Sequence, residues 1–326
     1  MSSKYDQLLE KFKEIQLLGT LSNVLYWDMN TYMPPSGLEF RTKQFQYLSQ
    51  RIHKLWTSTE MVNLISISEK NNELDELQRR NVVLLRRQYD NRTVIPGRLV
   101  GSIAAQSNKT LEIWKKAKAE NDFQMVLPDL ENLFSLNIEA AELLAKSKNI
   151  NDPYEALIDQ RDKGFSVTKL KQLFDEVKSF LVPFVKKCKE SSMQINRSFL
   201  SRNIPRAVQV DLVQDLASYF EYDYSKDKGV GRIDEVEHPL TIGCGPSDVR
   251  VTVKYHENNV LSAFLAGAHE CGHAIDGLQA NPEWIGQPIY RLDSPSLGES
   301  QSRFFENLIA SSIEFWEYYY PRFQKL

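Results

Sequence analysis

The spacing of apolar residues along the chain predicts a mostly helical protein. In residues 4–26 they recur at three- and four-residue steps, the period of a helix with one buried face. The same spacing predicts further helices over about 73–93, 97–120, 126–147, 167–190 and 205–220, and again over about 259–278 and 297–319. Pro34 and Pro35 end the first helix, and Ser36 is a candidate N-cap for the next one.

The pattern changes over residues 222–256, where glycines are frequent and the segment "VRVTVKY" (249–255) alternates apolar and polar residues. Such alternation predicts a β-strand with one buried face. We therefore expect a mainly α fold with a small β element, formed as a single domain over 1–326. Residues 1–221 would be its helical part, and residues 222–326 would hold the small sheet and the last two helices.

Composition narrows the class of protein. Hydrophobic residues make up 42% and charged residues 25% of the 326 residues, as in ordinary soluble globular proteins. The formal charge of −3, from 40 Lys and Arg against 43 Asp and Glu, favours neither nucleic acid nor an anionic membrane as a partner. No apolar run is long enough to span a membrane, and the N-terminus lacks the apolar stretch of a signal peptide. Three cysteines suggest no disulfide framework, so we expect a cytoplasmic protein.

The segment "GAHECGH" (267–273) places two histidines four residues apart on a predicted helix. Each helical residue turns by about 100°, so His269 and His273 lie roughly 40° apart and both can reach one ion. Glu270 lies at the edge of that face, where it can reach a water at the metal without joining the ligands. Cys271 points about 180° away from the histidines and is excluded as a ligand while the helix is regular.

The opposite face of this helix supports a metal site. It presents an apolar stripe that includes Phe264, Ala268 and Cys271, as expected of a face that packs on a core. The pattern H-E-x-x-H with such a stripe behind it favours a catalytic metal site. Histidines on an ordinary polar face and a structural zinc site are the alternatives.

A catalytic zinc site needs a third protein ligand and leaves one position for water. Glu299 begins the next predicted helix, in "SLGESQSRFFENLIASSIEFW", with Arg303 and Glu306 four and seven residues further on. A carboxylate there is favoured by the helix dipole, and Arg303 can hold the carboxylate beside it in a ligating orientation. A surface Glu–Arg pair is the alternative for Glu299, and His238 and His256 are weaker candidates for the third ligand.

Several segments together resemble the carboxypeptidase Taq family of zinc-dependent metallocarboxypeptidases. Along the chain they are "YWDMNTYMPPSGLEFRTKQFQYLS" (26–49), "WKKAKAENDF", "DPYEALID", "HPLTIGCGPSDVRVTVKY" (238–255), "HECGHAIDGLQANPEWIGQPI" and "ESQSRFFEN". Their order is that of the family. The resemblance implies a helical metallopeptidase with a central cleft, which removes single residues from peptide C-termini and usually forms a homodimer. It implies one Zn²⁺ per chain, with Co²⁺ as an alternative ion, bound by His269, His273 and Glu299. Glu270 would be the general base or acid.

The chain departs from the family pattern in three places. Gly298 stands where the family has a histidine beside the third ligand, and Asp276-Gly277 replaces part of a Tyr-Glu-Gln-Gly segment. The chain also stops at "YYYPRFQKL", where family members continue for about another third of their length. We therefore expect a complete metal site but weak peptidase activity. The dense aromatic residues of "IEFWEYYYPRFQKL" are expected to need a cover, either a second copy or the portion that is absent.

The expected reaction is metal-assisted amide hydrolysis, in which Glu270 takes a proton from water and delivers it to the leaving amine. The strand "VRVTVKY" could pair with an extended peptide substrate. Arg250 in that strand is a candidate clamp for a substrate carboxylate, with a structural ion pair to Asp248 as the alternative, and His238 is a weaker candidate for substrate binding. Two rival functions are a metal-binding but weakly active truncated homologue that binds peptides or dimerises, and a helical interaction protein without metal.

Overall fold

The computed structural model describes residues 3–193, 195–291 and 294–326. The chain packs into two compact units, of which unit 1 comprises residues 1–163 and 281–293 and unit 2 comprises residues 164–280 and 294–326. This division falls near residue 163 and not at residue 221, where the sequence pattern changes. The single domain expected from the sequence stays a prediction.

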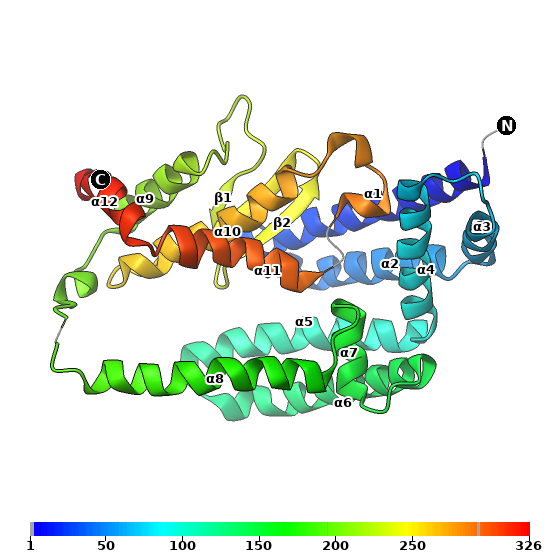
Figure 1. Cartoon of the computed structure of the whole chain (residues 1–326), viewed down its shortest axis with the longest axis horizontal. Helices are drawn as coiled ribbons and strands as arrows, with labels where there is room; N and C mark the ends of the chain where they lie inside the picture. The colour runs from blue at the N-terminus through cyan, green and yellow to red at the C-terminus, as the bar shows by residue number, and fades with distance from the viewer. Residues whose placement is uncertain (1–2, 194, 292–293) are drawn as a thin grey trace. The chain divides into compact units, whose positions relative to one another are not determined.

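Unit 1 is formed by helices (Figure 1). They are α1 (Lys4–Thr31), α2 (Leu38–Trp56), α3 (Thr59–Glu69), α4 (Glu76–Thr93), α5 (Gly97–Glu120), α6 (Phe123–Lys148) and α7 (Pro153–Arg161), with short 3₁₀ turns η1 (Pro35–Gly37), η3 (Pro282–Trp284) and η4 (Pro288–Tyr290). Its main core lies between α1, α3, α4 and the end of α2, with Leu8, Trp56, Ile65 and Leu85 almost completely buried. The predicted helices over 73–93, 97–120 and 126–147 correspond closely to α4, α5 and α6.

Local capping explains where several of these helices begin and end. Asp75 accepts a hydrogen bond from the backbone N–H of Gln78, whose side chain in turn accepts from the N–H of Asp75, the reciprocal arrangement of a capping box. α5 and α6 end at Asn121 and Asn149, both in the left-handed conformation that asparagine tolerates at helix ends. Ser36 was wrongly expected as an N-cap, because it lies inside η1, and α2 begins after Gly37.

Unit 2 combines helices with a small sheet (Figure 1). Its elements are α8 (Val167–Glu190), the 3₁₀ turn η2 (Ser198–Ser201), α9 (Arg206–Tyr219), β1 (Ile233–Glu235), β2 (Leu240–Gly245), β3 (Asp248–Val253), α10 (Val260–Leu278), α11 (Pro295–Arg303), the π-helical η5 (Phe304–Ile309) and α12 (Ile313–Lys325). The predicted mainly helical fold with a small β element beside the histidine helix is confirmed. The central cleft expected from the family resemblance stays a prediction.

The sheet has the strand order β1-β3-β2, with β1 parallel and β2 antiparallel to the central β3. Side chains alternate between the two faces of a strand. Val249, Val251 and Val253 of β3 are buried together with Cys271 and Ala274 of α10. The odd-numbered face of β3 therefore packs against the histidine helix.

A second core cluster covers another side of α10. Phe264 and Ala268 pack there with residues of α9 and with Phe315 and Tyr319 of α12. The Tyr319 hydroxyl donates a hydrogen bond of 2.7 Å to the carboxylate of Asp215 in α9. Helix α10 thus packs against the sheet and against α9 and α12 of its own unit. These contacts fix the direction of its third face, which carries the histidines.

One expectation about the C-terminal segment was wrong, and a second one holds for only part of the residues it named. The helix predicted over 297–319 is interrupted, because a π-helical turn follows α11 and the Ser312 side chain caps a new helix by accepting from the N–H of Phe315. The terminal aromatic residues also do not all need an external cover. Phe315 and Tyr319 are buried within unit 2, whereas Tyr318 and Tyr320 remain exposed. Among the described residues, no helix has both the length and the apolar character needed to cross a membrane.

Candidate metal centre

Helix α10 sorts its residues into a buried and a partly open face. Asn259 caps its first turn by accepting from the N–H of Ser262, and Phe264, Ala268 and Cys271 are buried. The side chains of His269 and His273 keep 17% and 24% of their surface exposed. Their ring centroids lie 4.9 Å apart, as expected for residues one helical turn apart.

Glu299 of α11 brings a carboxylate to both histidines. Its Oε2 lies 3.4 Å from Nε2 of His269 and 3.7 Å from Nε2 of His273, and the three donor atoms lie within 4.8 Å of one another. Ligands about 2.1 Å from a tetrahedral zinc ion are separated by roughly 3.4 Å. Two imidazoles and a carboxylate are also ligands that Zn²⁺ prefers. The three side chains therefore suit a small divalent cation.

Close packing between α10 and α11 places Glu299. A Cβ built on Gly272 would lie 2.9 Å from Cα of Ser302 and 3.1 Å from the carbonyl oxygen of Gln301. Only glycine lets the two backbones approach this closely. Ser302 is fully buried at this contact, and its hydroxyl lies 2.9 Å from the backbone oxygen and 3.1 Å from Oε2 of Glu299. The glycine between Glu270 and His273 thus brings the third carboxylate within reach.

Glu270 is buried beside the two histidines and faces the sheet. Its Oε2 lies 2.6 Å from the hydroxyl of Thr241 in β2, which also lies 2.9 Å from the backbone oxygen of Glu270. Burial raises the pKa of Glu270, the negative charges of Glu299 and Glu306 add to this, and the Thr241 hydrogen bond and His269 oppose it. A buried carboxyl with a raised pKa can both accept and return a proton near neutral pH.

The structure reveals contacts of His269 and Glu270 that the sequence did not predict. Glu306 lies 2.8 Å from Nδ1 of His269, and Arg303 donates a hydrogen bond of 2.8 Å to the same carboxylate oxygen of Glu306. Arg303 was expected to orient the proposed metal ligand Glu299. In the structure it binds the carboxylate of Glu306 instead. The spacing of seven residues between Glu299 and Glu306 was the only sequence signal for this role, and Thr241 had none.

Burial also affects the other groups of α10. It lowers the pKa of His273, which favours the neutral imidazole that a metal requires. It raises the pKa of the Cys271 thiol to about 12. Cys271 is fully buried among apolar residues of the sheet and α9, on the side away from the histidines. This placement is the one expected from the helix geometry.

The other sequence-predicted residues lie outside this group. Arg250 forms a two-bond ion pair with Asp248, at 2.8 and 2.7 Å, which is the alternative that the sequence left open. As an even-numbered residue of β3 it lies on the face of the sheet opposite to the one that packs on α10. His238 and His256 are exposed and do not belong to the group of candidate ligands. Carboxylate binding by Arg250 and substrate contact by His238 stay predictions.

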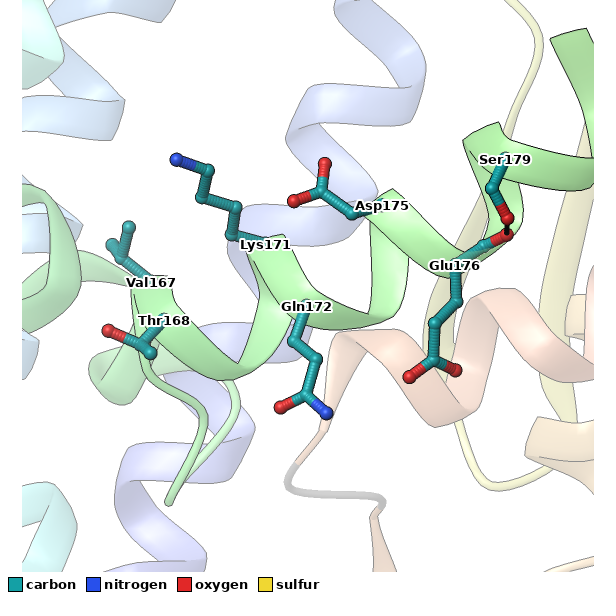
Figure 2. Close-up of a pocket in the computed structure, with 7 residues that line it drawn as sticks. All are labelled: Val167, Thr168, Lys171, Gln172, Asp175, Glu176 and Ser179. Carbon is teal, nitrogen blue, oxygen red and sulfur yellow. Dashed lines mark hydrogen bonds between the residues drawn. The ribbon is translucent and has the colours of Figure 1, made fainter.

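Two hollows of the surface hold none of the three candidate ligands. One follows α8, and Figure 2 shows that its lining side chains all come from this helix, with Lys171 and Asp175 on one side and Gln172 and Glu176 on the other. The other lies in unit 1 and is lined mainly by α1, α2, α4 and α5, with a volume of about 840 Å³. Among the described residues, the group of His, Cys, Asp or Glu side chains close enough to hold a metal ion together lies on α10 and α11, outside both hollows.

Known proteins are similar in sequence to almost the whole chain. A family model described as carboxypeptidase Taq (M32) metallopeptidase matches residues 7–326. Carboxypeptidase 1 of Bacillus subtilis (strain 168) is 30% identical over 320 residues, which cover 98% of this chain and 62% of that protein. Thermostable carboxypeptidase 1 of Thermus thermophilus is 32% identical over 329 residues, which cover 98% of this chain and 63% of that protein. The chain therefore spans less than two thirds of the length of these curated relatives.

Solved structures show the same fold. The Pyrococcus furiosus carboxypeptidase has a TM-score of 0.89 at 28% identity, over 100% of this chain and 64% of that chain. The M32 carboxypeptidase from Deinococcus radiodurans R1 has a TM-score of 0.88 at 26% identity, over 99% of this chain and 64% of that chain. With the family model matched along almost the whole sequence, this chain belongs to the carboxypeptidase Taq (M32) family of metallopeptidases.

Proposed function

We propose that this chain is a zinc-dependent metallocarboxypeptidase that removes C-terminal residues from peptides. The observation that supports it best is the convergence of His269, His273 and Glu299 within 4.8 Å, next to the buried carboxyl of Glu270. The relatives named above are carboxypeptidases, which favours this function over a peptide-binding module without activity. The removal of single C-terminal residues comes from the family, since the metal motif alone does not distinguish it from internal cleavage.

The residues divide the chemistry between binding and proton transfer. His269, His273 and Glu299 would hold the ion through Nε2, Nε2 and Oε2, the atoms that face one another. When bound, zinc polarises the scissile carbonyl and lowers the pKa of water towards 7. Glu270 accepts the proton of the attacking water and returns it to the leaving amine. Thr241 holds one oxygen of Glu270 by a 2.6 Å hydrogen bond, so the carboxyl keeps a defined direction.

Two measurements on one preparation test this function. Metal analysis should find about one zinc per chain, and a peptide pool with free C-termini should release single amino acids. The same peptides with amidated C-termini should resist cleavage, because a carboxypeptidase acts next to a free carboxylate. Cleavage of both pools at internal bonds would contradict the exopeptidase assignment, and absence of stoichiometric metal would contradict the metal site.

Substitution of Glu270 by Gln separates proton transfer from metal binding. We expect Glu270→Gln to retain the metal and to lose roughly 10²- to 10⁴-fold in hydrolysis, since the amide cannot accept a proton. Glu317→Gln is the matched control, because Glu317 is exposed on α12. Loss of the metal in Glu270→Gln would instead make Glu270 a ligand.

Three finer expectations accompany this proposal. Co²⁺ should replace Zn²⁺ in a metal-free preparation, which the visible absorption of the Co²⁺ protein would report. A homodimer is expected from the family resemblance, and sedimentation velocity measures it directly. A cytoplasmic location is expected from the sparse cysteines, and cell fractionation tests it.

A further inference from the structure

Glu306 contacts one of the proposed metal ligands through the ring nitrogen that does not face the other ligands. Oε2 of Glu306 lies 2.8 Å from Nδ1 of His269, while Nε2 of the same ring lies 3.4 Å from Oε2 of Glu299. We propose that Glu306 is a positioning residue, which accepts the Nδ1–H of His269 and leaves Nε2 as the atom that binds the ion. The inference rests on the proposed function, because it takes His269 as a metal ligand.

The chemistry of imidazole makes this contact decisive for the ring. A neutral imidazole has one N–H donor and one nitrogen lone pair, and the hydrogen bond at one nitrogen determines which atom carries the proton. An ionised carboxylate only accepts hydrogen bonds. Glu306 therefore favours the tautomer with the proton on Nδ1, and it holds the plane of the ring in a fixed orientation. Its side chain is 19% exposed, so little water competes for the contact.

Glu306 lies within the π-helical turn η5. In η5 the N–H of Ala310 bonds to the carbonyl of Phe305, five residues earlier, at 2.8 Å. The carbonyl of Glu306, which would accept from Ala310 in a regular α-helix, accepts instead from the Ser311 hydroxyl at 2.7 Å. π-Helical turns are rare and often mark functional sites. Here the widened turn contains Glu306 and lies next to α10.

Arg303 holds the same carboxylate from the solvent side. Its Nη1 donates to Oε2 of Glu306 at 2.8 Å, and its side chain is 58% exposed. An exposed ion pair of this kind contributes little to stability by itself. Arg303 therefore holds the Glu306 carboxylate on its solvent side, so that this carboxylate stays directed at the His269 ring. If Glu306 served only as a partner for Arg303, its removal would leave the state of His269 unchanged.

Removal of the acceptor tests the proposal in the full chain. In Glu306→Ala and in Glu306→Leu, which keeps more of the packing, we expect zinc affinity to fall 10- to 100-fold in a chelator competition. Imidazole ¹⁵N spectra of the metal-free protein should show Nδ1–H for His269 in the wild type and a mixture of tautomers in both variants. Glu317→Ala, at an exposed position on α12, should match the wild type in both measurements.

The outcomes separate this inference from the proposed function. Wild-type zinc affinity and an unchanged His269 tautomer in Glu306→Ala and Glu306→Leu would overturn the inference while the function stands. The inference would also be overturned by a second result. In that result Arg303→Gln lowers zinc affinity as much as Glu306→Leu does, and the tautomer of His269 is unchanged in both variants. If the wild type binds no zinc, the proposed function fails, and the tautomer of His269 in the metal-free protein still decides the role of Glu306.

Discussion

Cys271 lies between a proposed catalytic carboxyl and a proposed metal ligand, yet it belongs to the core. Its thiol is fully buried against the valines of β3, and burial raises its pKa to about 12. The thiolate that a metal requires is therefore disfavoured at neutral pH. Two residues of separation on a helix are enough to place neighbouring side chains on opposite faces.

Substitution of Cys271 by Ser should affect stability and spare the metal site. A hydroxyl buried without a partner costs on the order of 1–3 kcal/mol, so denaturant unfolding should show that loss while zinc affinity stays near the wild-type value. Cys188→Ser is the matched control, because Cys188 is exposed and should change neither quantity. A large fall in zinc affinity with unchanged stability would mean that Cys271 takes part in binding.

The glycine at position 298 departs from the family pattern, and close packing does not explain it. It stands directly before Glu299, where the family resemblance led us to expect a histidine, and a Cβ built there would meet nothing within 4 Å. Packing around the Cβ position therefore does not require glycine here. The absence of the histidine is not imposed by its surroundings in this chain.

The contact between helices α10 and α11 is set by a single glycine. Gly272 lets the backbone of Ser302 approach, and Ser302 in turn contacts Glu299. Gly267, five residues earlier on α10, faces a side chain, with Cγ1 of Val213 at 3.0 Å from its hypothetical Cβ. A side chain can rotate away, whereas a helix backbone can only shift as a body.

Alanine at these two glycines should have different effects. Gly272→Ala should push α11 away, with a loss of about 1–3 kcal/mol from overpacking and a marked loss of zinc affinity. Gly267→Ala should cost less and keep the metal, since the valine can adjust. Chemical unfolding and zinc titration of both variants measure this. Equal zinc affinity in the two would show that the approach of α11 does not depend on Gly272.

The division into two compact units assigns the whole candidate site to one of them. His269, His273, Glu299, Glu270 and Glu306 all belong to unit 2. A ligand that binds only the folded form stabilises that form by mass action. Because two units need not unfold together, the effect of the metal should be sought in the unfolding of unit 2.

Removal of the metal should therefore lower the stability of unit 2. At free zinc about 100-fold above the dissociation constant, the expected gain is about 2.7 kcal/mol. Scanning calorimetry with zinc and after chelation should show one transition that moves, and zinc should restore it. In His273→Ala the same addition should produce no shift. An equal shift in that variant would assign the stabilisation to another site.

Local periodicity was sufficient to predict helix α10, which carries His269, Glu270 and His273. The three- and four-residue spacing predicted α5, α8 and α10 almost to the residue, and the alternation in 249–255 predicted β3. The direction of His269 and His273, and the burial of Cys271 behind them, follow from the angle between successive residues of a helix. These features depend on neighbours within a few residues, so the sequence alone determined them.

The contacts between segments were decided only by the tertiary structure. Thr241 meets Glu270 across 29 residues, and Glu306 meets His269 across 37, where no local pattern specifies a partner. The break in the last predicted helix coincides with such contacts. Its widened turn carries Glu306, which contacts His269, and is followed by the buried Ala310. A helix period determines which face a side chain takes, but the neighbour on that face is chosen by the packing of the whole unit.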